Sequence, residues 1–316
     1  MLQQLIKTHF PYDELTAVYA YGSKVFPQYK SPPGKQTDLI FIVEDIDDFH
    51  KANKHKNIHH YSFIERYINQ AKRINNMGAR IYYHQNILID NNTYKYGVIS
   101  RKHFEDAMHS FSNPFICGRF HKPTLHVYSS NQQHNNYYDK LIQLNQRNAF
   151  ALVALKNKTN VSKETFYNDI INISYIGDIR RCMCLEGKDK SKRILKGAFK
   201  LFDAMYAKYA MSSTKTKLKL NDDLLMYYKQ LPLHVFQQAD ASDLKQVIRI
   251  FAPTHKTLND RQHQPQIAFH QFVSCLLVSF SGLPQQLRHF LALQGLQSGR
   301  VDAADFHLSL HRNLPD

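Results

Sequence analysis

Two apolar runs near the start of the chain are separated by a polar stretch. The first, Leu15 to Tyr21 (LTAVYAY), ends at Gly22-Ser23, and the second, Asp38 to Val43 (DLIFIV), is rich in β-branched residues. Short apolar runs bounded by Gly, Pro and polar residues are typical of buried strands. With the turn-forming segment 30–36 (KSPPGKQ) between them, they predict two core strands joined by a polar connection.

The pattern changes to helical spacing from Asp47 to about Met77. Apolar residues fall on one side of this predicted helix, and His, Asn and Lys fall on the opposite side. Three further strands are predicted at 80–83, 87–90 and 94–99, the last two joined at Asn91-Asn92, which suits a hairpin turn. Strands and helices alternate up to about residue 125, so the first part is predicted to be α/β or α+β.

Beyond Ser129 the pattern is mainly helical. The polar segment 129–136 (SSNQQHNN) is expected to be a linker, and a helix is expected from Asp139 to Leu155. Ser162 and the three residues after it are typical of a helix start. We expect three regions: a first domain at 1–128, a helical domain at 129–230 and a C-terminal helical region at 231–316.

Charge changes the picture, because the 316 residues include 41 Lys and Arg against 26 Asp and Glu, a formal net charge of +15. Such a field favours polyanionic partners, which are nucleic acid, nucleoside triphosphates or an anionic lipid surface. Charge alone does not choose among these three. The four cysteines lack the spacing of a zinc site and are expected to be small buried hydrophobes in a reducing compartment; they are Cys117, Cys182, Cys184 and Cys275.

No segment is expected to cross a membrane. Residues Met1 to Tyr12 lack the basic start and apolar run of a secretory signal. The most apolar stretch, Phe272 to Leu283, contains serines and is about half of the ~20 residues that a membrane helix needs. The Phe- and Leu-rich region from Ile267 to Leu296 is a candidate for contact with a membrane surface, although a core helix explains it equally well.

Candidate chemistry begins at Tyr21-Gly22-Ser23, where a strand ends, and at Asp38, where the next strand starts. Polymerase-β-type nucleotidyltransferases need this combination. Glycine lets the backbone approach a triphosphate, serine supplies a hydroxyl and an N–H group, and a strand carboxylate holds Mg²⁺.

The second carboxylate usual in that superfamily is missing from its expected place. That place is Ile40, or Gln36 if Asp38 is itself the second member. Glu44 and Asp45 lie ~20 Å further along an extended strand and are expected to be a solvated strand end. Asp90, beside the predicted hairpin turn, is expected to serve the turn.

His50, Asn53, Asn57 and His60 recur at spacings of three, four and three residues, so one helix would carry them on one face. Imidazoles and amides are unusual on a plain solvent face, where Lys and Glu dominate. A hydrated face in a chain with 18 His explains the spacing about as well as a binding site does.

Several blocks, in order over roughly residues 19 to 200, resemble the translocator-assembly-and-maintenance type of phosphatidate cytidylyltransferase, the peripheral mitochondrial-type CDP-diacylglycerol synthase. They are YGSKVF (21–26), DLIFIVED (38–45), FHKANKHKNIHHYS (49–62), YKYGVIS (94–100), GRFHKP (118–123) and SYIGDIR (174–180).

The resemblance implies an α+β protein with a polymerase-β-like nucleotidyltransferase domain, a winged-helix-like helical domain and C-terminal helices. It implies that CTP and Mg²⁺ bind between the domains and that the cytidylyl group passes to phosphatidic acid in an anionic membrane. The implied catalytic residues are Asp38, which holds the metal, and Ser23. The implied nucleotide-binding residues are Tyr21, Gly22, Ser23, His50, Asn53, Asn57, His60 and Lys95. The implied substrate-phosphate residues are Arg119, Lys122, Asp178 and Arg180.

Two other functions stay open at this stage. Another polymerase-β-type nucleotidyltransferase, acting on RNA, a protein or a small molecule, would share the Gly-Ser and Asp signature. A nucleic-acid-binding module would explain the charge, but the basic residues are dispersed and no KH, RRM or zinc-finger pattern is present, so no nucleic acid partner is expected. We expect a cytoplasmic protein on the inner face of the membrane if the chain is bacterial, and a protein on the matrix side of the mitochondrial inner membrane if it is a mature eukaryotic chain.

Overall fold

The structure is a computed structural model of the chain. It describes residues 2–30, 36–62, 65–66, 75, 80–157, 160–175, 189–221, 226–227 and 230–232. All of these lie in the first of two compact units, Met1–Cys275. The predicted C-terminal helices, including Ile267 to Leu296, lie outside the described residues.

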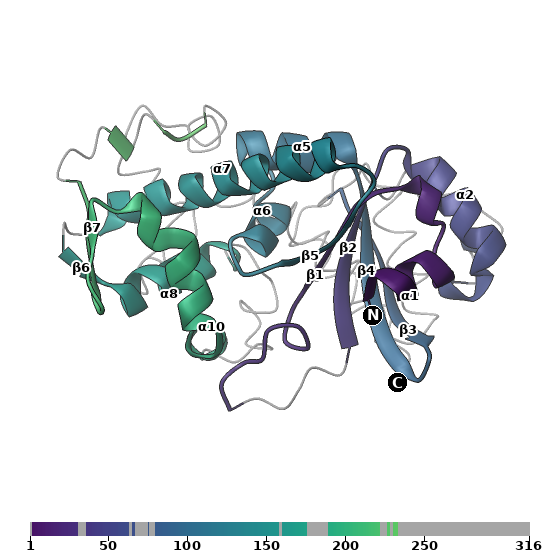
Figure 1. Ribbon diagram of the computed structural model, residues 1–316, viewed down its shortest axis with the longest axis horizontal. Helices are drawn as coiled ribbons and strands as arrows, with labels where there is room; N and C mark the ends of the chain where they lie inside the picture. Colours follow the sequence, from purple (N-terminus) through teal and green to yellow (C-terminus); the bar gives the residue numbers. More distant parts are fainter. Residues whose placement is uncertain are drawn as a thin grey trace, which may run out of the picture. The chain divides into compact units, whose positions relative to one another are not determined.

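A mixed five-stranded sheet forms the centre of the first part (Figure 1). Its strand order is β3-β4-β2-β1-β5, in which β2 and β4 are parallel and the other neighbours are antiparallel. The strands are β1 Leu15–Tyr21, β2 Gln36–Val43, β3 Tyr82–Ile89, β4 Asn92–Ser100 and β5 Leu125–Ser129. The two predicted apolar runs are thus the two central antiparallel strands β1 and β2, and the expected α+β class is confirmed.

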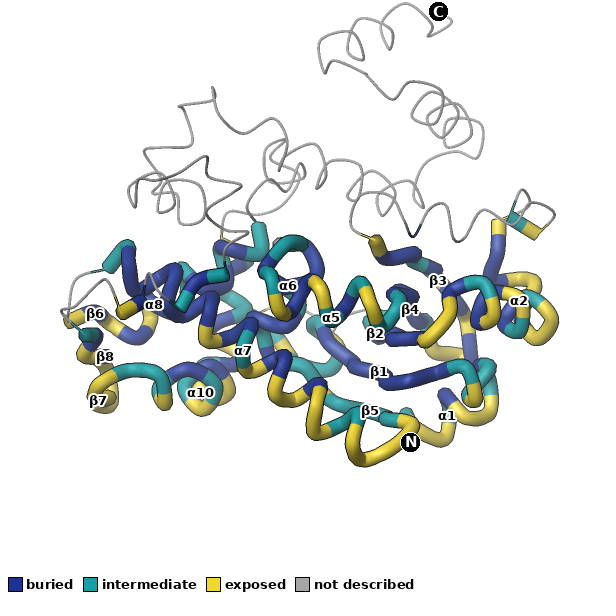
Figure 2. The backbone as a smooth tube through the Cα atoms, turned by 90° about the horizontal axis from the view of Figure 1, so that it is seen from above, coloured by how far each residue is buried: buried dark blue, intermediate teal, exposed yellow. Residues whose placement is uncertain are grey.

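Helices cover both faces of this sheet, which is why its central strands are buried along nearly their whole length (Figure 2). On one face, Phe41 of β2 contacts Phe10, which follows α1 (Leu2–His9), and Phe49 of α2 (Ile46–Lys56). On the other face, Tyr19 of β1 packs edge-on against Phe120 at the end of α6 (Pro114–Phe120). The helices α5 (Arg101–Ser110) and α7 (Gln132–Lys156) complete that second layer.

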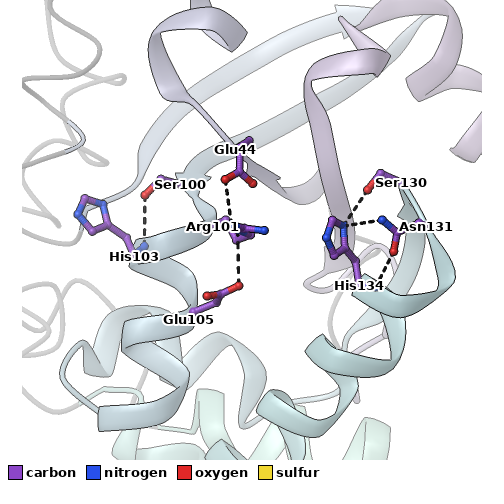
Figure 3. A network of polar contacts seen from close by, with 8 residues as sticks. All are labelled: Glu44, Ser100, Arg101, His103, Glu105, Ser130, Asn131 and His134. Carbon is purple, nitrogen blue, oxygen red and sulfur yellow. Dashed lines mark hydrogen bonds and ion pairs between the residues drawn. The ribbon is translucent and has the colours of Figure 1, made fainter.

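Polar caps mark where the helices begin. Ser162 accepts a hydrogen bond from the backbone N–H of Thr165 and caps α8 (Lys163–Ile173), which confirms the predicted helix start. Asn131 caps α7 in the same way through the N–H of His134 (Figure 3). The expected linker at 129–136 is therefore wrong in its second half, because this cap starts the helix at Gln132.

Two other predicted elements differ from the structure. The helix expected from Asp47 to about Met77 ends at Lys56, after which Asn57 leaves the helical conformation and a short 3-10 turn, η2 Ile58–His60, follows. The two strands predicted at 80–83 and 87–90 form one bulged strand, β3, with Asn86 in the left-handed region. Its hairpin turn is Asp90-Asn91, one residue earlier than expected, and both residues have positive φ.

The second part is a helical layer with a small three-stranded sheet. After α7 come β6 (Asn160–Ser162), α8, α10 (Lys190–Tyr206) and the hairpin formed by β7 (Ser212–Ser213) and β8 (Lys217–Lys219). The sheet order is β6-β8-β7, and along the chain the elements follow one another as helix, strand, helix, helix and hairpin. The winged-helix-like character of this part stays a prediction. Among the described residues, none of the helices is long and apolar enough to span a membrane.

An ion pair joins the two helices that support this sheet. Lys163 Nζ of α8 lies 2.6 Å from Asp203 Oδ1 of α10, and the Tyr167 hydroxyl donates to the same oxygen at 2.7 Å. Burial alone would raise the pKa of Asp203, but these two donors lower it below its usual value. The contact fixes α10, whose first turn lies near the candidate site.

Candidate active site

The backbone crosses directly over Asp38 at Gly22. Tyr21, the last residue of β1, is paired in register with Asp38 of β2, and Gly22 follows with φ +86°. A Cβ built on Gly22 would overlap Asp38 Oδ2. Only glycine combines this φ with so close an approach. The N–H groups of Val25 and Phe26 then donate to the Gly22 carbonyl, so the turn that contains Ser23 closes tightly beside the carboxylate.

The charges of three basic side chains from different elements act on Asp38. Lys95 stands next to it in register on the parallel strand β4, Arg119 comes from α6 and Lys190 from the first turn of α10. Burial raises the pKa of Asp38, whereas the charges of Lys95, Arg119 and Lys190 oppose that rise. One carboxylate among three cations gives a site that attracts polyanions.

Two tyrosines hold the basic groups in place. The Lys95 ammonium lies 4.6 Å from the ring centre of Tyr83, and the Arg119 guanidinium lies 5.5 Å from that of Tyr21. Burial raises the pKa of Tyr83, and the charge of Arg119 opposes that rise. Sequence reasoning missed Tyr83. Its pairing with Gly97 puts it on the same face as Lys95, but that is visible only once the register of β3 and β4 is known.

Lys122, three residues after Arg119, contacts Ser174 at the end of α8. Lys122 Nζ donates to Ser174 Oγ at 2.9 Å and lies 5.0 Å from the ring centre of Tyr175. A Cβ on Gly118 would lie 2.7 Å from Ser174 Cα, so only glycine allows this contact. The structure thus brings Lys122 to the segment that leads to Asp178 and Arg180. Both of those residues lie outside the described part of the chain.

The four predicted His and Asn residues do come together, but on the opposite face of the sheet from Asp38. Side chains alternate along a strand, so Asp38 and Lys95 face one side while their neighbours Leu39 and Tyr96 face the other. The α2 helix packs on that other side. The structure therefore does not bring this set to the Asp38 carboxylate.

On that face the set forms a buried hydrogen-bond network around two tyrosine hydroxyls. Asn53 Nδ2 donates to Tyr61 at 3.0 Å and to Tyr96 at 2.9 Å. His50 Nδ1 lies 2.8 Å from the Tyr61 hydroxyl, and His60 Nδ1 lies 2.9 Å from that of Tyr96. Asn57 Nδ2 donates to Asn53 Oδ1 at 2.8 Å. One continuous helix is not needed for this, because the turn after Lys56 returns His60 to the same side.

Burial keeps these imidazoles neutral. It lowers the pKa of His50 to about 3 and that of His60 to about 4, with nearby Lys54 and His59 adding to the two effects. His84 of β3, beside both, also has a lowered pKa, mainly through burial. Neutral imidazoles act here as fixed hydrogen-bonding groups and not as cations for a phosphate.

The other carboxylates considered for the metal have structural roles. Glu44 Oε1 pairs with Arg101 Nη2 at 3.0 Å (Figure 3), and Asp45 caps α2 through the N–H groups of Asp47 and Asp48. Asp90 lies in the hairpin turn, 3.5 Å from His9. In the described part of the chain no three His, Cys, Asp or Glu side chains are grouped as a metal site. Asp38 could offer one carboxylate to a divalent cation, and such ions can be held by one or two carboxylates together with substrate phosphates.

A mixed sheet with a carboxylate under a Gly-Ser turn is the arrangement of a polymerase-β-like nucleotidyltransferase fold, and this is the class that the fold and site define. The chain belongs to the family described as "Phosphatidate cytidylyltransferase, mitochondrial", whose sequence model matches residues 2–267.

Individual relatives carry the same description. The protein of Mus musculus is 34% identical over 195 residues, covering 59% of this chain and 55% of the relative. The protein of Schizosaccharomyces pombe is 24% identical over 299 residues, covering 92% of this chain and 66% of the relative. This chain therefore spans somewhat more than half the length of these relatives. A match to the solved structure of a nucleotidyltransferase-like protein from Exiguobacterium sibiricum covers 89% of this chain and 90% of that protein, with 8% identity and a TM-score of 0.26.

Proposed function

We propose that the protein transfers the cytidylyl group of CTP to phosphatidic acid, giving CDP-diacylglycerol and pyrophosphate. The observation that carries this proposal is Asp38, which lies under the Gly22 turn and among Lys95, Arg119 and Lys190 in a chain of this family. Both substrates are anions, and the surrounding cations are suited to bring two anions together.

The reaction needs positioning more than proton transfer. A phosphate oxygen of phosphatidic acid attacks the α-phosphorus of CTP, the bond to the bridging oxygen of the β-phosphate breaks, and pyrophosphate leaves. That oxygen is already largely ionised at neutral pH, because the second pKa of a phosphate monoester is about 6. No side chain has to remove a proton, so the site's work is to align the two groups and neutralise the growing charge.

A divalent cation fits the site through Asp38, and we assign Mg²⁺ to it. When bound, the ion neutralises charge on the triphosphate and polarises the reacting phosphoryl group. Gly22 and Ser23 would place their backbone against the triphosphate, with the Tyr21 ring behind them. Lys95 and Arg119, fixed by Tyr83 and Tyr21, would neutralise the phosphates.

The remaining predicted residues take two roles in this proposal. Lys122 would face the phosphate of the lipid, together with Asp178 and Arg180 of the separate block 174–180, whose first residue, Ser174, Lys122 contacts. The buried His and Asn network would act from behind the sheet, because it fixes the hydroxyl of Tyr96, the residue next to Lys95. These four residues are proposed as positioning residues and not as nucleotide contacts.

The compartment is part of the same proposal. The relatives are named mitochondrial. We place a eukaryotic form of this chain on the matrix side of the mitochondrial inner membrane and a bacterial form on the cytoplasmic side of its membrane, where phosphatidic acid is available.

Labelled CTP, Mg²⁺ and phosphatidic acid vesicles test the activity directly. The expected result is a labelled lipid with the mobility of CDP-diacylglycerol and one pyrophosphate per lipid formed. If pyrophosphate is released only when RNA, a protein or a small molecule replaces the lipid, the protein has another nucleotidyltransferase activity. Absence of turnover with every acceptor would contradict the enzyme assignment.

A further inference from the structure

The helix α10 exposes a series of lysines along its length. Lys192, Lys196 and Lys200 follow one another at intervals of four residues, and Lys208 lies just beyond the helix in η3 (Ala207–Tyr209). All four are exposed, on both sides of the kink at Ala198. Leu201, next to Lys200 in α10, is also exposed, with 43% of its surface accessible.

The β7–β8 hairpin continues this basic surface. Residues 211–217 and Lys219 are all exposed, and only Leu218 is buried. Lys217 and Lys219 pair with Ser162 and Asn160 of β6, so they lie on the outer face of the small sheet, away from Leu218. Met211, at the base of the hairpin, is 62% exposed. Figure 2 shows the hairpin near α10, with exposed residues on both. We call α10, η3 and this hairpin the lysine face.

The lysine face lacks the acidic residues that a solvated surface normally mixes with basic ones. Between residues 190 and 221 the only acidic residue is Asp203, and it is held by Lys163 and Tyr167. Like charges four residues apart on a helix destabilise it. Lys196 lies 3.8 Å from the ring centre of Tyr29, a contact that leaves its charge in place. A surface that keeps this repulsion is suited to a polyanionic partner.

The lysine face starts at the candidate active site. The charge of Lys190, in the first turn of α10, acts on Asp38. The loop after Gly22 is tied to the same turn, since the N–H of Tyr29 donates to the Arg193 carbonyl at 3.1 Å. From Lys192 to Lys208 the lysines extend for about 24 Å at the helical rise of 1.5 Å per residue. A flat anionic surface along α10 would therefore present its head groups at the end of the helix nearest Asp38.

We propose that the lysine face docks the protein on an anionic phospholipid bilayer and sets the orientation in which a lipid phosphate reaches the Asp38 site. The inference rests on the proposed function for the identity of that lipid. It is independent of the C-terminal region, which lies outside the described residues.

Two observations favour a bilayer over nucleic acid. The exposed cations are lysines, which act as point charges, whereas Arg193 is the only arginine from 190 to 221 and is partly buried. Leu201 and Met211 are exposed among them, and an apolar side chain beside lysines suits the boundary between head groups and acyl chains.

The test compares two variants with the same loss of charge. Lys200→Glu, Lys208→Glu and Lys217→Glu together change the lysine face without touching residues assigned to the site. Lys51→Glu, Lys102→Glu and Lys140→Glu change three exposed lysines elsewhere. Binding is measured by co-sedimentation with vesicles of equal parts phosphatidylcholine and phosphatidylglycerol. We expect the first variant to lose roughly 100-fold in vesicle partitioning, and the second to lose about threefold or less.

Turnover separates docking from chemistry. A short-chain phosphatidic acid dissolved below its micelle concentration should be converted by the first variant at the wild-type rate, whereas the same headgroup in vesicles should be converted poorly. Equal vesicle binding by the two variants would overturn the lysine face as the docking surface, even if the wild-type enzyme is active. The bilayer proposal would also be overturned if the wild type bound duplex DNA or RNA more tightly than vesicles and the first variant lost that binding. The partner of the lysine face would then be a nucleic acid. Inactivity of the wild type on the dissolved lipid would instead refute the proposed function.

Discussion

At the scale of single residues, the site depends on a glycine and a carboxylate that share one small space. The Gly22 backbone takes the volume that any other residue would fill with a side chain, and Asp38 Oδ2 occupies it. The carboxylate is consequently buried, with its pKa raised by burial in spite of three neighbouring cations. A carboxylate in that state is poorly solvated by water, so a divalent cation and phosphate oxygens that bound there would replace little solvent.

Replacement of Asp38 by Asn tests this assignment. The amide keeps the size of the side chain and removes a buried charge, so we expect an unchanged or slightly higher melting temperature. Activity should fall at least ~1,000-fold, since the ligand for the cation and its stabilisation of the transition state are lost. Glu44→Gln, a carboxylate paired with Arg101 near the other end of β2, is the matched control and should keep full activity. Asp38→Asn enzyme with near wild-type kcat in Mg²⁺ would refute the metal-ligand role.

Tyr83→Phe tests the positioning of Arg119. The substitution keeps the ring under Lys95 and removes a buried hydroxyl whose pKa responds to the charge of Arg119. We expect KM for CTP to rise about tenfold, equivalent to about 1.4 kcal/mol, with kcat changed much less. The control is Tyr82→Phe, whose hydroxyl contacts Glu65 on the opposite face; it should affect stability and not KM. Equal effects of the two substitutions on KM would show that Tyr83 has only a structural role.

Residues near one another in sequence were predictable, and residues joined only by register were not. Gly22 and Asp38 each adjoin a recognisable strand, so their proximity follows from pairing those strands. Tyr83 enters the site only through its register with Gly97, which no local pattern specifies. The spacing of His50, Asn53 and their partners correctly indicates a shared side, but spacing says nothing about which face of the sheet that side meets.

At the scale of elements, capping residues explain which helix boundaries were predicted. Ser162 and the residues after it form a recognisable helix start, and α8 begins there. Asn131 lies within a polar stretch that also suits a linker, so the pattern predicts a later start for α7 than the structure shows. No glycine or proline marks the end of α2 at Lys56. The Asn57 side-chain amide instead donates to Asn53 and to the carbonyl of His9, which belongs to a segment distant in sequence.

The contact between α8 and α10 provides a prediction at this scale. Lys163 is almost fully buried, so Asp203→Asn leaves its charge without a counter-ion, and we expect a loss of roughly 2–3 kcal/mol of unfolding free energy. Replacing both partners, as Lys163→Met with Asp203→Leu, should be far less harmful because no buried charge remains. Urea unfolding of the three proteins checks the order. A double variant less stable than Asp203→Asn would contradict it.

At the scale of the whole molecule, buried histidines link stability to pH. Burial is the main cause that lowers the pKa of His50 to about 3, of His60 to about 4 and of His121 to about 3. Around His50 the facing groups are Lys54, His84, Tyr61 and Tyr82, which supply no counter-charge. In the unfolded chain each histidine has its ordinary pKa of about 6.5 and binds a proton below that pH. The same histidines stay neutral in the folded state.

Stability should therefore fall as pH decreases from about 6.5 towards 4, since the unfolded state binds more protons in that window. Each of these histidines lowers the free energy of unfolding by at most about 1.4 kcal/mol for each pH unit of acidification. Urea midpoints measured from neutral pH down to that range check the slope, and His50→Gln should make it shallower. A midpoint that does not change with pH, or a slope unaffected by that substitution, would contradict the argument.

The parallel pairing of β2 with β4 also has a consequence for the order of folding. The β3–β4 hairpin closes through a two-residue turn and forms from local contacts, and β1 with β2 needs only a moderate loop. Joining the two pairs requires contacts between segments far apart in the chain, which is the entropically slow step. That same step brings Lys95 to Asp38. A nascent or partly refolded chain therefore carries the carboxylate without Lys95 beside it, and competence for catalysis should not appear before β2 has paired with β4.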